Sequence, residues 1–139
     1  MGGSSVYIYQ EARQMVPHPV VTEVRQIASN QVLLVYDQRA DFGSATRLSN
    51  YWIRSNKGAG GAASLGMDEA LTAANAIRPE AAMITAADNT NTRFIITFRE
   101  RPMTGVTHIV LPCFVSVEGM TGYGGANWGP FSRNVFIGM

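Results

Sequence analysis

The sequence predicts an all-β protein, an immunoglobulin-like β-sandwich of about seven strands with a short helical insertion. Short runs of β-branched and aromatic residues alternate with turn residues along most of the chain, and only one segment has a helix-like pattern. At 139 residues, with 46% hydrophobic and 15% charged residues, the chain fits one globular domain with a core of ordinary size. We expect residues 17–139 to form this domain. Residues 1–16 are expected to be a linker, of the Gly- and Ser-rich kind that cloning adds, or an edge strand.

Three strands are expected in the first part of the chain. Prolines at 17 and 19 precede the first run, and the runs themselves cover residues 20–27, 31–36 and 50–54. In the third run, alternation places Tyr51 and Ile53 on one face of the sheet and Trp52 and Arg54 on the other.

The segment from Lys57 to Pro79 differs in composition from the rest. Residues 57–63 are rich in Gly and Ala and predict a flexible stretch, whereas residues 67–77 predict a short helix that ends before Pro79. A helix this short is marginal alone. We therefore expect it to dock the apolar stripe of Met67 and Leu71 on a sheet edge or an end of the sandwich.

Four more strands are expected in the second half of the chain, at residues 82–86, 92–98, 106–111 and 133–137. A long Gly-rich loop, residues 120–130, precedes the last of them. From these runs we expect the following residues to be in the core: Leu33, Val35, Ile96, Phe98, Ile109 and Leu111.

No group of residues predicts catalysis or a metal centre. His18 and His108 are the only histidines, and neither has the neighbours that a His-based zinc site needs. Cys113 is the only cysteine, so no internal disulfide forms, and its apolar surroundings predict a small packing residue and not a reactive thiol. Three loop carboxylates, Asp37, Asp41 and Asp88, leave open whether calcium binds, although turn acids that bond the backbone are the simpler interpretation. We expect no enzyme activity and no cofactor.

Composition also limits the partners. The formal net charge is +1, which gives no basis for binding nucleic acid. No apolar run approaches the length of a membrane span, and we expect no signal peptide in these residues. The ends of the sequence suggest a domain taken from a larger chain, with neighbouring domains as partners.

Two aromatic residues in the Gly-rich loop are the candidate ligand-binding residues. Tyr123 and Trp128 could form a stacking platform for a sugar ring or a partner chain. Alternatively, Trp128 folds back and plugs the end of the sandwich, which burial of so large a side chain favours.

Three stretches resemble a bacterial family of immunoglobulin-like surface repeats, the SwmB-like repeats, which are related to fibronectin type III domains. The first comprises residues 35–41, Ser44-Ala45-Thr46 and residues 49–53; the second runs from 88 to 98, and the third from 105 to 122. The sequence departs from the family at His108, where a tyrosine is usual, and in two long insertions, residues 57–79 and the loop after Gly119. The histidine puts the buried hydroxyl contact of a tyrosine corner in doubt.

The resemblance implies a function and a location. It implies a non-catalytic structural or adhesive module of a multidomain bacterial protein, located at the cell surface or secreted, with a protein or glycan as a further ligand. The alternatives are a carbohydrate-binding accessory domain and an assembly domain of a virion or phage tail.

Overall fold

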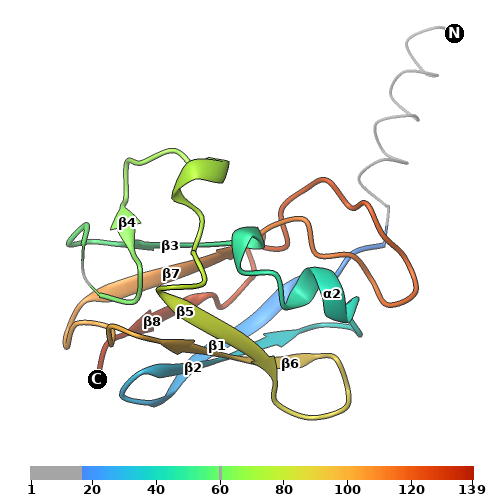
Figure 1. Cartoon of the computed structure of the whole chain (residues 1–139), viewed down its shortest axis with the longest axis horizontal. Coiled ribbons are helices and arrows are strands. Elements are labelled where there is room, and N and C mark those ends of the chain that lie inside the picture. Colours follow the sequence, from blue (N-terminus) through green and yellow to red (C-terminus); the bar gives the residue numbers. More distant parts are fainter. Residues whose placement is uncertain (1–16, 60) are drawn as a thin grey trace, which may run out of the picture.

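Two four-stranded sheets pack face to face (Figure 1). The computed structural model describes residues 17–59 and 61–139, so the expected linker or edge strand in residues 1–16 lies outside the described chain. The first sheet has the order β1-β2-β6-β5 and the second β4-β3-β7-β8. The strands are β1 Val21–Ala28, β2 Gln31–Tyr36, β3 Tyr51–Ser55, β4 Leu65–Gly66, β5 Ala82–Ala86, β6 Arg93–Phe98, β7 Thr107–Pro112 and β8 Val135–Ile137.

The strand order confirms the predicted fold class. Leaving out the two-residue β4, the sheets have the immunoglobulin-like arrangement of four strands against three, and all their pairings are antiparallel. Each of the seven predicted runs forms a strand close to its expected position. β4 is an addition, which pairs parallel to β3.

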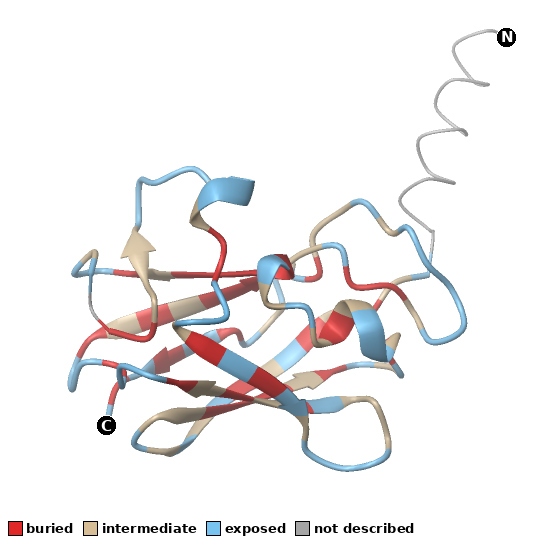
Figure 2. Ribbon diagram, in the orientation of Figure 1, coloured by how far each residue is buried: buried red, intermediate tan, exposed pale blue. Residues whose placement is uncertain are grey.

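The main core lies between the sheets, and the alternation of buried and exposed residues is visible along β5 in Figure 2. β6 directs Phe94, Ile96 and Phe98 into this core, as its alternation predicts. Of the expected core residues on β2 and β7, Leu33 and Leu111 are buried, whereas Val35 and Ile109 are only partly buried. The residues of these strands that face the main core are Val32, Leu34, Tyr36 and Val110, and Leu111 packs on the opposite side of its sheet.

A second apolar cluster covers the outer face of β3 and β7. It consists of Trp52, Ala76 and Leu111, with Leu65 and Leu71 packed against it. Of the expected stripe, Leu71 therefore docks, on the outer face of the sheet, whereas Met67 is 46% exposed and does not take part.

The predicted helix at residues 67–77 is wrong. The only helical turn in this segment is a 3-10 turn, η2, at Ala73–Asn75. The Trp52 indole donates to the carbonyl of Thr72 at 2.8 Å, and the guanidinium of Arg54 donates to the carbonyl of Glu69 at 2.7 Å. An α-helix would use these carbonyls internally, so the extended chain gives the side chains of β3 their partners.

The two ends of β1 mark two opposite ends of the molecule. At its start, the Val21 amide donates to the Asn127 carbonyl at 2.8 Å; near its end, the Met139 amide donates to the Gln26 side chain at 2.9 Å. The described chain thus begins at one end of the sandwich and finishes at the other (Figure 1). We refer to the end that holds Val21 and Asn127 as the entry pole.

Candidate binding surface

Two long loops meet at the entry pole. The β2–β3 loop, residues 37–50, contains α2 (Phe42–Ala45) and the 3-10 turn η1 (Leu48–Asn50), and the β7–β8 loop covers residues 113–134. Arg39 and Glu118 join them through an ion pair of 3.0 Å between Nε and Oε1. The Ser116 amide also donates to the hydroxyl of Ser44 at 3.0 Å. These bonds hold the loops as one surface, which is the part of the fold that most often carries binding residues.

Asn127 anchors the β7–β8 loop from inside. Its side chain is completely buried, accepts from the Val115 amide at 2.9 Å and donates to the carbonyls of Val115 and Pro19 at 2.9 and 2.7 Å. The amide therefore connects the loop to itself and to the segment that precedes β1. Sequence reasoning missed this residue, because an asparagine in a Gly-rich loop reads as a turn residue.

Tyr123 is half-buried and already stacked. Its ring lies 4.3 Å from that of His18, with 8° between the planes, and its hydroxyl donates to the Ala126 carbonyl at 2.8 Å. Burial raises the pKa of Tyr123. His18 therefore covers one face of the ring, and a ligand could stack only on the other.

Trp128 does not plug the sandwich. It is 37% exposed and belongs to neither apolar cluster. Burial raises the pKa of the Cys113 thiol, and a hydrogen bond with the Trp128 side chain partly opposes this rise. Tyr123 and Trp128 make no ring contact with each other within the described chain, so the structure does not assemble them into a single platform.

Phe114 lies beside them in a strained conformation. Its φ angle is 64°, a region that bulky residues rarely adopt, and its side chain is 44% exposed. The ring meets Trp52 edge to face, with centroids 6.2 Å apart. Strain of this kind costs about 1 to 3 kcal/mol and is often found at functional sites.

A hollow of about 330 Å³ lies between the two loops. Phe114 and Tyr123 supply aromatic surface, and Asp41, Arg47 and Asn50 supply charged and polar groups. Aromatic faces combined with hydrogen-bonding groups suit a sugar or a short peptide.

Among the described residues, Phe131 is the most exposed large apolar residue at this pole, at 96%. It lies at the border of two further hollows, one beside β1 and one beside Val20. A phenylalanine that buries almost nothing in its own chain is available for contact with a partner. The residue lies just outside the loop segment that sequence reasoning singled out.

The three loop carboxylates serve the backbone. Asp37 accepts from the Val20 amide and Asp41 from the Ser44 amide, both at 2.9 Å, the latter as the N-cap of α2. Asp88 accepts from the amide and hydroxyl of Thr90, which lower its pKa. Within the described residues no three His, Cys, Asp or Glu side chains gather as metal ligands.

His108, on β7, and Cys113, directly after it, lie on opposite faces of the second sheet. His108 is completely buried and stacks on Phe136, with centroids 4.9 Å apart, whereas Cys113 is half-buried beside the second cluster. A thiol–imidazole pair is therefore ruled out. A buried tyrosine hydroxyl is found on β3 instead: Tyr51 donates to the Ala45 carbonyl and bonds to the Tyr36 hydroxyl at 2.7 Å.

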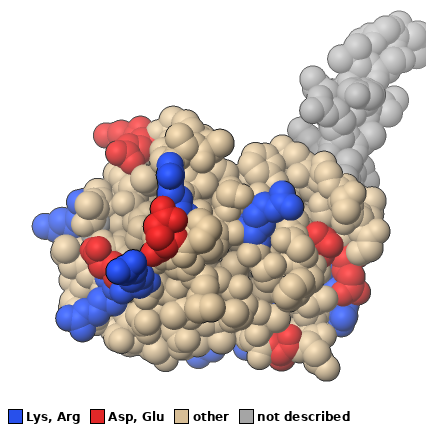
Figure 3. All heavy atoms as spheres, in the orientation of Figure 1, with Lys and Arg blue, Asp and Glu red and all other residues tan. Residues whose placement is uncertain are grey.

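Charge is scattered over the face drawn in Figure 3, where Lys and Arg side chains lie beside Asp and Glu.

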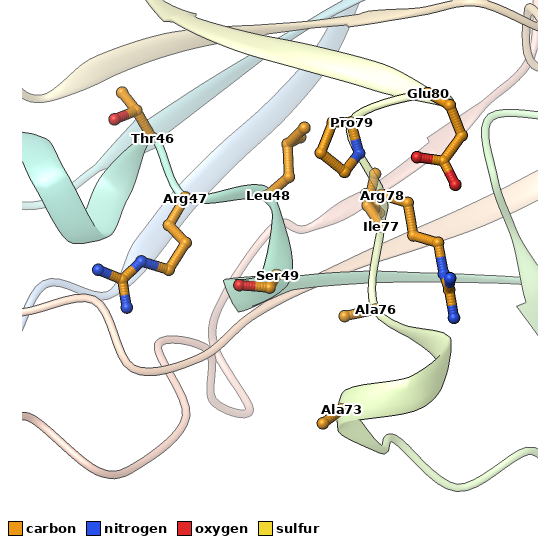
Figure 4. Close-up of a pocket in the computed structure, with 10 residues that line it drawn as sticks. All are labelled: Thr46, Arg47, Leu48, Ser49, Ala73, Ala76, Ile77, Arg78, Pro79 and Glu80. Atoms are coloured by element: carbon orange, nitrogen blue, oxygen red, sulfur yellow. The ribbon is translucent and has the colours of Figure 1, made fainter.

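Another hollow, of about 520 Å³, separates η1 from the segment that leads to β5 (Figure 4). Leu48 lies on one side of it and Ala76, Ile77 and Pro79 on the other, with Arg78 and Glu80 at one end. Neither surface brings together groups for acid–base or nucleophilic chemistry.

Comparisons with known proteins show a shared fold. No protein-family model and no curated protein sequence matches the chain. Among solved structures, domains 1–6 of the surface layer protein SbsC match with a TM-score of 0.56 and 12% identity, over 97% of this chain and 16% of that one. A second structure, S-layer protein rSbsC(31-844), matches with a TM-score of 0.56 and 14% identity, over 97% and 15%. This chain thus spans about a sixth of the length of the surface-layer chains it resembles. No helix among the described residues is long and apolar enough to cross a membrane.

Proposed function

We propose that this chain is a non-catalytic structural module of a multidomain bacterial cell-surface or secreted protein. The observation that carries the proposal is the fold match, in which nearly the whole chain aligns with a small part of two surface-layer structures. A SwmB-like or fibronectin type III-like repeat is the finer form of the same proposal, and an adhesive role is its extension.

The geometry suits a module that joins neighbours end to end. The described chain enters at one end of the sandwich and leaves at the other, so successive modules would follow one another along its length. The ion pair and hydrogen bonds at the entry pole hold the two loops together at that end. Phe131 offers an apolar contact to the preceding domain.

The test is the location of the parent protein. Antibodies raised against the folded module are expected to label intact cells of the source organism, or the medium if the protein is released. Labelling only after the cells are permeabilised would contradict the proposal. A cytoplasmic protein labelled in parallel provides the control for cell integrity.

A carbohydrate-binding accessory domain is the second candidate, favoured by the hollow that Phe114 and Tyr123 line. If it holds, a glycan array gives a signal that Tyr123→Ala reduces and Phe131→Ala, outside that hollow, does not. If only Trp128→Ala abolished the signal, the binding site would lie at Trp128, beside Cys113, and not in this hollow. No signal with the unaltered chain would eliminate this candidate and leave the structural module.

A further inference from the structure

Two of the hollows on the surface lie next to each other. The larger, of about 520 Å³, lies between η1 and the segment that leads to β5, and the smaller, of about 330 Å³, lies between the two loops of the entry pole. Arg47 lines both hollows, so they meet at this residue, beside the turn that η1 forms. We call the two hollows together the η1 groove.

Arg47 brings an unpaired positive charge to the middle of the η1 groove. Its side chain is exposed and makes neither an ion pair nor a hydrogen bond with the described residues. Arg39, by contrast, pairs with Glu118, and Arg78 donates to the Ala74 carbonyl at 3.0 Å. A guanidinium group binds a carboxylate through two parallel hydrogen bonds. The groove therefore suits a ligand that places a carboxylate at its middle.

The two halves of the groove offer apolar surface. In the larger hollow, Leu48 lies on one side and Pro79 and Ala76 on the other (Figure 4). In the smaller hollow, Phe114, whose side chain is 44% exposed, and Tyr123 present their rings. A ligand that fills the groove therefore carries its carboxylate between two apolar groups.

The other charged groups of the groove limit the ligand to a single negative charge. Asp41 lines the smaller hollow, where one of its carboxylate oxygens accepts from the Ser44 amide at 2.9 Å. Glu80 lies with Arg78 at one end of the larger hollow (Figure 4). Both carboxylates repel negative charge, so a polyanion fits the groove less well than a ligand with one carboxylate beside Arg47.

The walls of the groove are fixed before a ligand binds. At η1, the Asn50 amide donates to the Arg47 carbonyl at 3.0 Å, and the Asn50 side chain donates to the Ser44 carbonyl at 2.9 Å. On the opposite wall, the Ile77 amide donates to the Tyr51 carbonyl at 3.0 Å. Both walls are thus tied to the start of β3, so binding costs little ordering of the chain.

We propose that the η1 groove binds a peptide segment of another protein, in which one Asp or Glu lies between two apolar residues. The carboxylate pairs with Arg47, an aliphatic side chain fills the larger hollow, and a second apolar side chain packs on Phe114 and Tyr123. A peptide is favoured over a sugar because Leu48 and Ile77 present aliphatic carbon in the larger hollow and no partner for a sugar hydroxyl. This inference gives the adhesive extension of the proposed function a partner, and its failure would leave the structural module standing.

Binding of synthetic peptides is the first test. The probes are end-blocked, fluorescein-labelled peptides with a central Glu, separated by one or two positions from Ala, Ser, Leu or Phe on each side, and the same peptides with a central Gln. Peptides with Glu between Leu and Phe are expected to bind the full chain at least about tenfold more tightly than their Gln counterparts, because Gln cannot form the charged pair. Arg47→Gln should remove this difference. Arg99→Gln, the same change at an exposed arginine outside the groove, is the matched control and should preserve it.

A second variant tests the apolar half of the groove. Ala73 is exposed on η2 and lines the larger hollow, so Ala73→Trp fills that hollow from a surface position. It is expected to weaken the binding of Glu and Gln peptides alike. Melting curves of each variant establish that it is folded. The amide NMR signals of Ser49 and Gly122, which line the two different hollows, should both shift when the tightest peptide is added.

Several results would overturn the proposal. These are no binding by any Glu peptide, equal binding of the Glu and Gln peptides, and NMR shifts confined to one hollow. Arg47-dependent binding of glycans, with no binding of any peptide, would also overturn it and would assign the groove to an acidic sugar. None of these results affects the proposed surface-module function, which is tested by location and not by peptide binding.

Discussion

At the scale of single residues, the most unusual group is the imidazole of His108. It is completely buried in the main core, stacked on Phe136, and neither ring nitrogen makes a hydrogen bond of good geometry within the described chain. Burial lowers its pKa, and the nearby backbone of Met103 only partly opposes that shift. The neutral form is therefore the one that the fold accommodates.

The position of this histidine predicts how stability depends on pH. Because its pKa is lower in the folded chain than in the unfolded one, the unfolded chain binds more protons as the pH falls below about 6.5. The free energy of unfolding is expected to be insensitive to His108 above that pH and to decrease below it. Urea titrations at neutral and mildly acidic pH, compared with His108→Phe, measure this. An equal loss of stability in the variant would assign the effect to other groups.

Asn127 gives a second prediction at this scale. Asn127→Ala removes three hydrogen bonds and leaves the groups of Val115 and Pro19 buried without partners, so it is expected to cost about 3 kcal/mol. Asn134→Ala is the matched control, since that buried amide makes one bond, to the Val110 carbonyl. Chemical denaturation of both variants should show the larger loss at Asn127. Equal losses would mean that the loop relaxes to satisfy these groups.

At the scale of elements, the strands were predictable and their faces were not. The turn residues that bound each run are local signals, so the seven strands appear where the sequence places them. β2 has apolar residues on both sides, and so does β7, whose outer face is covered by the second cluster. Alternation cannot orient such a strand, whereas in β6 Arg93 and Thr97 mark the outer face and the prediction was right.

The insertion, residues 57–79, shows a second limit of prediction from sequence. A local pattern predicted a helix at residues 67–77. The side chains of Trp52 and Arg54, distant in sequence, instead donate hydrogen bonds to the carbonyls that a helix would need. The Gly-rich stretch before it was expected to be flexible, yet Ala62 is completely buried and its amide donates to the Glu100 carbonyl at 3.0 Å. Contacts with residues distant in sequence therefore determine the conformation of both segments. Of the candidate site, the sequence indicated the loop and two aromatic residues, and it missed Asn127, Phe114 and Phe131.

Two glycines in this segment test how closely it approaches the backbone of a neighbouring segment. A Cβ at Gly61 would lie 2.2 Å from the Arg101 carbonyl oxygen, and its φ is +81°, so Gly61→Ala is expected to cost about 2 kcal/mol or more. Gly58 also has a positive φ, +66°, but an added Cβ there meets nothing within 4 Å. Gly58→Ala should therefore cost only the conformational penalty of about 1 kcal/mol. Thermal unfolding of the two variants separates steric contact from backbone strain; equal losses would show that no close approach exists.

At the scale of the whole molecule, one packed core between the sheets is the main source of stability. Phe98, the last residue of β6, belongs to this core and is almost completely buried. Phe98→Ala is expected to cost about 3 to 5 kcal/mol, a large part of the stability of a domain of this size. Phe131→Ala, which removes an equal side chain from the surface, should change the free energy of unfolding by less than about 0.5 kcal/mol. A small effect at Phe98 would mean that the sheets rearrange to fill the cavity.

A molecule held together by burial should be indifferent to reagents that remove covalent or metal cross-links. Cys113 has no cysteine partner, so a reductant has no internal disulfide to break. At the β2–β3 loop, Asp37 and Asp41 each use a carboxylate oxygen to accept a backbone amide, which leaves fewer oxygens for the six to eight that calcium requires. The melting temperature is therefore expected to be the same with EDTA, with added calcium and with reductant. A substantial fall with EDTA that calcium reverses would place an ion at this loop, and Asp37→Asn and Asp41→Asn would then identify its ligands by removing the response.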